Sequence, residues 1–248
     1  LGDAECVPIL LSLVPAPGAL GKEARASLSR LAAPGTDEAI LADAAQGTDE
    51  RRVLCVDALI DRRASSSVPA LLGYARAKHA ELVACACRGL GILAQEGDLP
   101  ALVQVLISVN DKTARRDAAK ATVAVARRCP LGDARTVALL AALPRASEEA
   151  QTAILGVCGE LGGTAAFATV RDRLADPSPT IRDAALRALA AWPDAAPADT
   201  LLELAQAEND PVRQVLALRG AVRAMAQPGA PAPQTAVAFL RQAMAAAR

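Results

Sequence analysis

Six cysteines are the residues of this sequence whose chemistry would be easiest to use. They could bind zinc, form disulfides or act as nucleophiles, but none follows another at the Cys-x-x-Cys spacing of a zinc site. Cys85 and Cys87 are the closest pair, and two residues apart on a helix their side chains diverge. The sequence therefore predicts small buried hydrophobic side chains at Cys6, Cys55, Cys85, Cys87, Cys129 and Cys158.

His79 is the only histidine of the chain. General-base catalysis or metal binding needs neighbouring groups that converge on the imidazole. Lys78 and Glu81 make an ordinary solvated turn instead, so we expect a surface histidine. A Ser-His-Asp arrangement would have to use this exposed residue, and the sequence predicts no catalytic residue, no metal site and no cofactor.

Two glycine-containing segments resemble nucleotide-binding motifs in sequence. Gly89-Leu-Gly91-Ile-Leu-Ala94 matches the dinucleotide pattern G-x-G-x-x-A, which functions between a strand and a helix. Here it falls inside an expected helix, where glycine allows close helix packing. Gly159-Glu-Leu-Gly-Gly163 lacks the Gly-Lys-Ser/Thr ending of a phosphate loop and falls where a helix should end through a left-handed glycine.

Charge, aromatic content and hydropathy limit the classes of partner. Lys plus Arg and Asp plus Glu number 27 each, and aromatic residues make up 2% of the chain. Nucleic-acid binding uses clustered positive charge and aromatic stacking, so no nucleic-acid partner is predicted. No apolar run approaches the roughly 18 residues that span a bilayer, and no signal peptide is visible. Because Leu1 stands inside repeat-like sequence, we expect a fragment of a longer protein, monomeric by itself.

An internal repeat organises the whole sequence. Its anchor is a position in the first turn of a second helix, and successive anchors are 28 to 35 residues apart: Ala24, Arg52, Val83, Arg116, Gln151, Arg182 and Arg213. Seven residues after each anchor stand Leu31, Leu59, Leu90, Val123, Cys158, Leu189 and Gly220. All but the last have apolar side chains, and a two-turn apolar recurrence predicts a helix with one buried face.

Each repeat predicts a hairpin of two helices, over 4–32, 37–61, 67–94, 99–128, 133–161, 165–191 and 198–226. First helices are expected over 4–13, 37–46, 67–77, 99–108, 133–143, 165–175 and 198–207. Second helices are expected over 22–32, 50–61, 80–94, 112–128, 148–161, 180–191 and 211–226, with a final helix over 232–246. Cap candidates for second helices include Asp49, Asn110, Ser147 and Asp210. The predicted fold is all-α, a right-handed α-solenoid in one domain over residues 1–248.

The segment from Asp176-Pro177 to Ile181-Arg-Asp-Ala-Ala-Leu-Arg-Ala-Leu189 resembles HEAT repeats, particularly the short bacterial kind called HEAT-like. The resemblance covers essentially the entire chain, although repeats one, three and five depart from it at the anchor. In that family the anchor arginine and a capping aspartate usually form a polar ladder between repeats. The resemblance carries this ladder over to Arg52 with Asp49, Arg116 with Asp111, Arg182 with Asp176 and Arg213 with Asp210.

A narrower likeness lies at the C-terminal end. Residues 199–205 and 209–220 look like the HEAT arrays of large planctomycete-type bacterial proteins. Those proteins are often exported, and the array can adjoin a carbohydrate-active or other domain. This resemblance slightly favours an exported or periplasmic location, while the sequence itself shows no targeting segment.

The family resemblance implies a non-catalytic protein-binding or scaffolding module whose second helices line a concave face. Candidate partner-binding residues stand five positions after an anchor or nearby: Asp57, Arg88, Lys120, Arg127 and Arg187. The sequence is also compatible with two other functions. One is that of a structural spacer within a larger exported protein. The other is a HEAT-fold enzyme resembling a bilin lyase or a DNA glycosylase, which would need a basic groove with aromatic or acidic catalytic side chains.

Four arginine pairs raise the question of a basic strip. If stacking aligned them, they could bind phosphate or an acidic protein; otherwise they are dispersed solvated charge with Asp57, Asp61 and Asp117 interleaved. The pairs are Arg51-Arg52, Arg62-Arg63, Arg115-Arg116 and Arg127-Arg128. Trp192, at the end of a second helix, is expected to pack in the core, with a partner anchor as the alternative.

Overall fold

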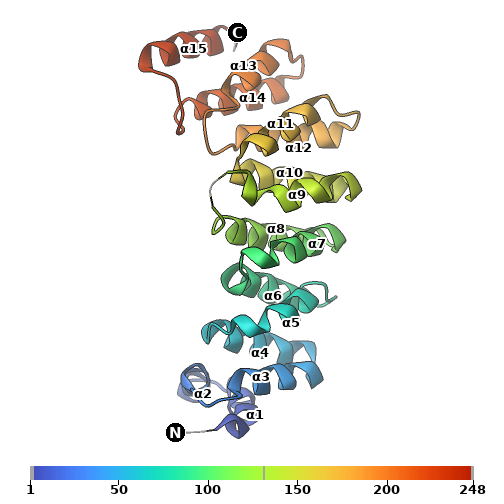
Figure 1. The fold of residues 1–248 in the computed structure, drawn as a ribbon, viewed down its shortest axis with the longest axis vertical. Helices are drawn as coiled ribbons and strands as arrows, with labels where there is room; N and C mark the ends of the chain where they lie inside the picture. Colours follow the sequence, from blue (N-terminus) through green and yellow to red (C-terminus); the bar gives the residue numbers. More distant parts are fainter. Residues whose placement is uncertain (1–2, 131, 247–248) are drawn as a thin grey trace. The chain divides into compact units, whose positions relative to one another are not determined.

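A computed structural model of the chain describes residues 3–130 and 132–246. Within these residues every regular element is helical: fifteen α-helices and several single 3-10 turns, with no strand (Figure 1). The all-α prediction is confirmed. The chain divides into two compact units, unit 1 over Leu1–Val125 and unit 2 over Ala126–Arg248.

Unit 1 consists of four helical hairpins. They pair α1 (Val7–Leu13) with α2 (Ala19–Arg30), α3 (Thr36–Gln46) with α4 (Asp49–Asp61), α5 (Val68–Tyr74) with α6 (Ala80–Leu93), and α7 (Leu99–Ser108) with α8 (Lys112–Ala126). The first helices α1 and α3 contact each other, as do α5 and α7. The second helices α2, α4 and α6 form a second layer in which each contacts the next. This stacking of hairpins in two layers is the arrangement of an α-solenoid.

Unit 2 repeats the same plan. Its helices are α9 (Val137–Ala142), α10 (Glu148–Leu161), α11 (Thr164–Asp172), α12 (Pro179–Ala190), α13 (Ala198–Ala207), α14 (Pro211–Ala224) and α15 (Pro233–Ala246). The second helices α10, α12 and α14 pack in order, and α15 lies against α13 and α14 (Figure 1). The fold class of stacked helical hairpins is therefore present in both units. One array over residues 1–248 stays a prediction.

The helix that departs most from its predicted range is α9. The sequence predicts a first helix over 133–143, whereas only Val137–Ala142 is α-helical, with 3-10 turns at Asp133–Arg135 and Leu143–Arg145. Gly132 enters the first turn with a φ of 101°, which no helix uses. Pro144 has no backbone N–H to donate to the carbonyl four residues before it, so the α-helical hydrogen bonds stop there. Local backbone restrictions therefore shorten this α-helix at both ends, where 3-10 turns replace it.

Side-chain caps determine where the second helices begin. Each cap accepts a hydrogen bond from a backbone N–H of the first turn, which has no partner within the helix. The capping residues are Thr48, His79, Asp111, Ser147, Ser178 and Asp210. The predicted caps Ser147 and Asp210 are confirmed, but Thr48 and Asp111 act in place of Asp49 and Asn110.

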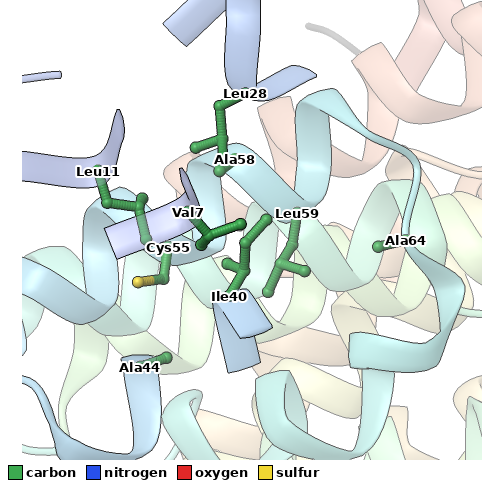
Figure 2. Close-up of a cluster of buried hydrophobic side chains, with 9 residues drawn as sticks. All are labelled: Val7, Leu11, Leu28, Ile40, Ala44, Cys55, Ala58, Leu59 and Ala64. Atoms are coloured by element: carbon green, nitrogen blue, oxygen red, sulfur yellow. The ribbon is translucent and has the colours of Figure 1, made fainter. Parts of the chain in front are cut away.

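The core lies between the two layers of each unit. In unit 1, a cluster of side chains from α1 to α4 shows how the first two hairpins are joined (Figure 2). Val7 and Leu11 come from α1, Ile40 from α3 and Leu59 from α4, and all four are fully buried. Because one hairpin cannot cover its own apolar face, stability depends on such contacts with the neighbouring repeat.

An ion pair at the edge of this cluster ties the second hairpin to the first. The Arg51 Nε lies 2.6 Å from the Asp43 Oδ1, and the Arg51 Nη2 also donates to the backbone oxygen of Pro8 at 3.2 Å. Both side chains are mostly buried, at 24% and 16% exposed. The hydrogen bond from Arg51 is the main reason why the pKa of Asp43 lies below its usual range.

We expect Asp43→Asn to destabilise unit 1 at neutral pH by about 1–3 kcal/mol, because the buried Arg51 loses a charged partner. Since the pKa of Asp43 is lower in the folded chain, the carboxylate stabilises the fold above its unfolded pKa of about 3.9. That contribution is lost as the pH falls through the lowered pKa. Urea unfolding followed by circular dichroism, from neutral pH down to about pH 2.5, measures it.

The matched control is Glu38→Gln, the same change of charge at an exposed position of α3. The stability of this variant should stay within about 0.5 kcal/mol of the parent. A difference between Asp43→Asn and the parent that persists unchanged at acid pH would show that the ion pair is not its source.

Candidate functional site

The anchor residues of the second helices make one recurring contact. Their side-chain N–H groups donate to a backbone oxygen at or just after the end of the preceding first helix, which the helix leaves without a partner. The contacts are Arg52 to Ala44 at 3.1 Å, Arg115 to Val109 at 2.6 Å, Gln151 to Ala146 at 2.9 Å, Arg182 to Asp176 at 2.8 Å and Gln214 to Ala205 at 3.1 Å. This bond sets the rotation of α4, α8, α10, α12 and α14 about their axes, whereas the anchors Ala24 and Val83 of the other two second helices have no side-chain N–H.

Two anchors differ from the sequence prediction by one residue. The contact is made by Arg115 instead of Arg116, and by Gln214 instead of Arg213. Gln151, which departs from the family pattern, makes the same contact through its amide. Any long N–H donor can satisfy the carbonyl, so residue type did not distinguish neighbouring candidates.

The predicted polar ladder is corrected in the same way. Arg52 contacts Asp49 at 2.8 Å, but within one helix. Arg182 binds the backbone oxygen of Asp176, whose carboxylate pairs with Arg173. Asp111 and Asp210, the partners predicted for Arg116 and Arg213, accept backbone N–H hydrogen bonds as helix caps. Arg213 instead joins neighbouring repeats by pairing with Asp183 of α12, and it also contacts Glu208 at 2.7 Å.

With the anchors corrected, equivalent positions of the second helices from α4 to α14 form a common row that is exposed or half-buried. We define the exposed row as the positions one and five residues after the anchor. At the fifth position stand Asp57, Arg88, Lys120, Gly156, Arg187 and Arg219. Four of the five predicted partner-binding residues lie here. Arg127 does not, since it follows the end of α8 and pairs with Glu160 at 3.3 Å. Arg219 was missed because the anchor of its repeat was placed one residue too early.

In unit 1 the exposed row carries paired charges. Asp57 of α4 forms ion pairs with Arg88 of α6 and with Arg25 of α2, and Arg25 also contacts Asp61 at 2.7 Å. Lys120 of α8 lies 3.5 Å from Asp117. Arg25, Arg88 and Lys120 therefore each have a carboxylate beside them.

A groove between α6 and α8 lies on this exposed row. Its volume is about 400 Å³, and its lining consists of Ala84, Cys87, Arg88, Gly91, Ile92, Asp117, Lys120, Ala121 and Ala124. A second hollow of about 320 Å³ continues it, because Asp117 lines both. The lining is apolar and made mostly of small residues, while Arg88, Asp117 and Lys120 carry both signs of charge.

Small side chains create this groove. A Cβ atom added to Gly91 would lie 3.6 Å from the Ala121 Cα, which is ordinary contact distance, so α6 and α8 approach closely at this point. Ala84 and Ala124 leave space on either side, and Ile92 is 37% exposed. The result is an apolar floor that a partner side chain could cover.

All six cysteines are predicted to be buried, and the structure confirms this for five of them. Cys55, Cys85, Cys87, Cys129 and Cys158 are buried, and Cys6 is half-buried. Burial raises the pKa of Cys87 to about 12, with a further contribution from Asp117. Burial raises the pKa of Cys85 to about 12 as well, and Asp57, 3.1 Å from its sulfur, adds to it. These thiols remain protonated near neutral pH and are poor nucleophiles.

The remaining sequence motifs have structural roles. The imidazole Nδ1 of His79 accepts a hydrogen bond from the Leu82 N–H at 3.3 Å and so caps α6. Gly89 and Gly91 lie inside α6, as expected. Gly162 and Gly163, with φ angles of 73° and 106°, follow the end of α10.

The arginine pairs are dispersed, and most of them hold the repeats together. Arg62 is an example: it pairs with Asp37 and donates to the backbone oxygens of Leu28 and Leu31 at 2.8 and 2.6 Å. Arg51, Arg52, Arg115 and Arg127 make the contacts given above. In unit 1 these arginines are therefore engaged with carboxylates or backbone oxygens.

Within the part of the chain that the structure describes, no cluster of three or more metal-ligating side chains is present. Over the same residues, no helix combines the length and the apolar character that crossing a bilayer requires.

Residues 136–219 match the family model of HEAT repeats. The matched region runs from just before α9 to the middle of α14 and so covers most of unit 2. No curated protein matches the chain.

Among the solved structures that are similar to the chain are the following three. One is the complex of CpcE and CpcF of phycocyanin lyase from Nostoc sp. PCC7120, with 16% identity over 97% of this chain and 94% of that one, and a TM-score of 0.42. An archaeal HEAT-like repeats protein from Thermococcus onnurineus NA1 has 13% identity over 97% and 95%, with a TM-score of 0.42. An engineered protein has 18% identity over 99% and 81%, with a TM-score of 0.38.

Proposed function

We propose that this chain is a non-catalytic protein-binding module, in which the exposed row of the second helices holds a partner protein. The observation that carries the proposal is the groove between α6 and α8. It combines an apolar floor with Arg88, Asp117 and Lys120 at its side, within a volume of about 400 Å³. A groove of this kind takes apolar side chains, while charges of both signs orient the peptide that bears them.

The chemistry of the groove supports binding over catalysis. Cys87, at its floor, has a pKa raised to about 12 by burial, and the single histidine is engaged in capping α6. The other ionisable groups of the groove are Arg88, Lys120 and Asp117. Arg88 is paired with Asp57, and Lys120 with Asp117, so neither cation is held ready for a reacting group. A structural spacer would need no groove on the exposed row.

The likeness of the C-terminal residues to planctomycete-type arrays, and the exported location that it implies, stay predictions. That the chain is a fragment of a longer protein also stays a prediction.

Selection of peptides from a random library, displayed on phage, tests the proposal. The groove variant is the double substitution Ala84→Phe and Ala124→Phe, which fills the groove. Its control is Gln104→Phe, which places the same side chain on the exposed face of α7. We expect an enriched peptide whose dissociation constant rises by about tenfold or more in the groove variant. Gln104→Phe should change it by less than about twofold.

Peptides that bind the groove variant as well as the parent would overturn the proposal. Turnover of a bilin or of damaged DNA by the parent protein would overturn it as well, because the chain would then be an enzyme.

A further inference from the structure

The exposed face of α14 differs from that of the other second helices. Val212, Val215 and Val222 are 73%, 45% and 45% exposed. Together with Arg219 they follow one another at spacings of three, four and three residues, so they form one stripe along the helix. On the neighbouring α12 the positions equivalent to Val212 and Val215 are Thr180 and Asp183. We call these four residues of α14 the valine stripe.

Two arginines of the exposed row accompany the valine stripe. Arg187 of α12 and Arg219 of α14 are exposed, and neither makes a side-chain hydrogen bond or an ion pair within the described residues. Asp183, the carboxylate nearest in sequence on α12, is already paired with Arg213. In unit 1, by comparison, Arg25, Arg88 and Lys120 each have a carboxylate partner, and only Arg116 of the positive side chains on the row has no ion pair among the described residues. In the part of the chain that the structure describes, Arg187 and Arg219 therefore have no carboxylate at ion-pair distance, and their guanidinium groups face solvent.

Close packing places the two arginines on one surface. A Cβ atom added to Gly220 would lie 2.8 Å from the Ala190 Cβ, so α12 and α14 touch there. Arg219 directly precedes Gly220, and Arg187 stands one turn before Ala190. Arg223, on the next turn of α14, donates to the backbone oxygen of Ala190 at 2.9 Å. Arg187 and Arg219 therefore lie on adjacent helices, separated by roughly the 8–10 Å of packed helix axes.

We infer that the valine stripe, with Arg187 and Arg219, binds an acidic amphipathic helix of a partner protein. The stripe repeats at the three-and-four spacing with which helices pack against each other, and it covers about 15 Å of α14, or nearly three turns. Apolar side chains of the partner would cover the valines, which water otherwise contacts. Carboxylates beside them would pair with the two arginines in bidentate geometry.

This inference rests on the proposed protein-binding function. It adds a second binding surface, in unit 2, and gives the chemical class of the partner that binds there. It is tested with a synthetic three-heptad peptide that carries Leu at the a and d positions and Glu at e and g. The glutamates keep such peptides from pairing with themselves. The comparison peptides have Lys in place of Glu, or the same composition in scrambled order. Fluorescence anisotropy with the whole chain measures binding.

We expect the acidic peptide to bind about tenfold or more tightly than the lysine peptide, and its binding to weaken with added salt. Arg219→Glu should weaken binding by about tenfold or more, and Val215→Ser by about fivefold. The matched control is Arg145→Glu, the same change at an exposed arginine of unit 2 away from α14, which should change binding by less than about twofold.

Equal binding of the acidic, lysine and scrambled peptides would overturn the inference. So would an equal loss of binding in Arg145→Glu and Arg219→Glu, since only overall charge would then matter. Failure here is distinguishable from failure of the proposed function, because the phage selection depends on Ala84 and Ala124 in unit 1. An acidic peptide that binds normally to the groove variant and poorly to Arg219→Glu would separate the two sites.

Discussion

Replacing Trp192 with alanine is expected to destabilise unit 2 by about 3–5 kcal/mol. Trp192 is 2% exposed and is the largest of the fully buried side chains. Its ring lies edge-on to that of Phe167, with centroids 5.7 Å apart, and Pro193 and Gly162 close the same corner. Removing the indole leaves a cavity between α11 and the end of α12, which the surrounding helices can fill only in part.

Urea unfolding followed by circular dichroism measures this loss. Trp192→Phe keeps an aromatic ring beside Phe167 and should lose less than half as much. Leu20→Ala, at a side chain that is 53% exposed, controls for truncation of a large residue on the surface. A loss in Trp192→Ala no larger than that of Leu20→Ala would show that the indole is not part of the core, and would return Trp192 to the role of a partner anchor.

The second large effect is expected from Gly159→Val, which should destabilise unit 2 by about 3 kcal/mol. A Cβ atom at residue 159 would lie 2.7 Å from both the Cα and the backbone oxygen of Ala188. Because these are backbone atoms of α12, they cannot rotate away as a side chain would. The two helices would have to move apart, and the buried contacts on both sides of Gly159 would be lost.

The matched control is Gly156→Val, on the same helix, where an added Cβ has no neighbour within 4 Å. Since Trp192 is the only tryptophan of the chain, its fluorescence reports the unfolding of unit 2 in both variants. Both substitutions change helix propensity equally, so their difference measures the close approach of α10 and α12. Equal stability of the two variants would contradict the tight contact.

Local patterns predicted the helices well because the signals that start and bury a helix are local. The two-turn recurrence of apolar residues located every second helix, and each predicted helix is present. Ser147 and Asp210 cap helices as expected, since a side-chain oxygen next to the first turn suffices. The short α9 was not predicted, because its limits depend on the turn at Gly132 and on Pro144.

The position five residues after the anchor identified the exposed row only where the anchor was placed correctly, and Lys120 was predicted as a neighbour of that position. Asp57, Arg88 and Arg187 follow from anchors that the structure retains. In the repeats of α8 and α14 the anchor moved by one residue, which is a rotation of about 100° about the helix axis. That rotation puts Lys120 and Arg219 on the row, and it releases Arg213 to pair with Asp183.

By itself the sequence determined an all-helical chain of paired helices with one apolar face each, because helix periodicity and capping act within a few residues. The tertiary structure alone decided which neighbour each charged side chain meets. Arg115 rather than Arg116 reaches the carbonyl of Val109, and Arg88 meets a carboxylate whereas Arg187 and Arg219 do not. The groove between α6 and α8 and the valine stripe of α14 arise in the same way. Each is set by how one helix packs against the next, and residue spacing within a single helix does not contain that information.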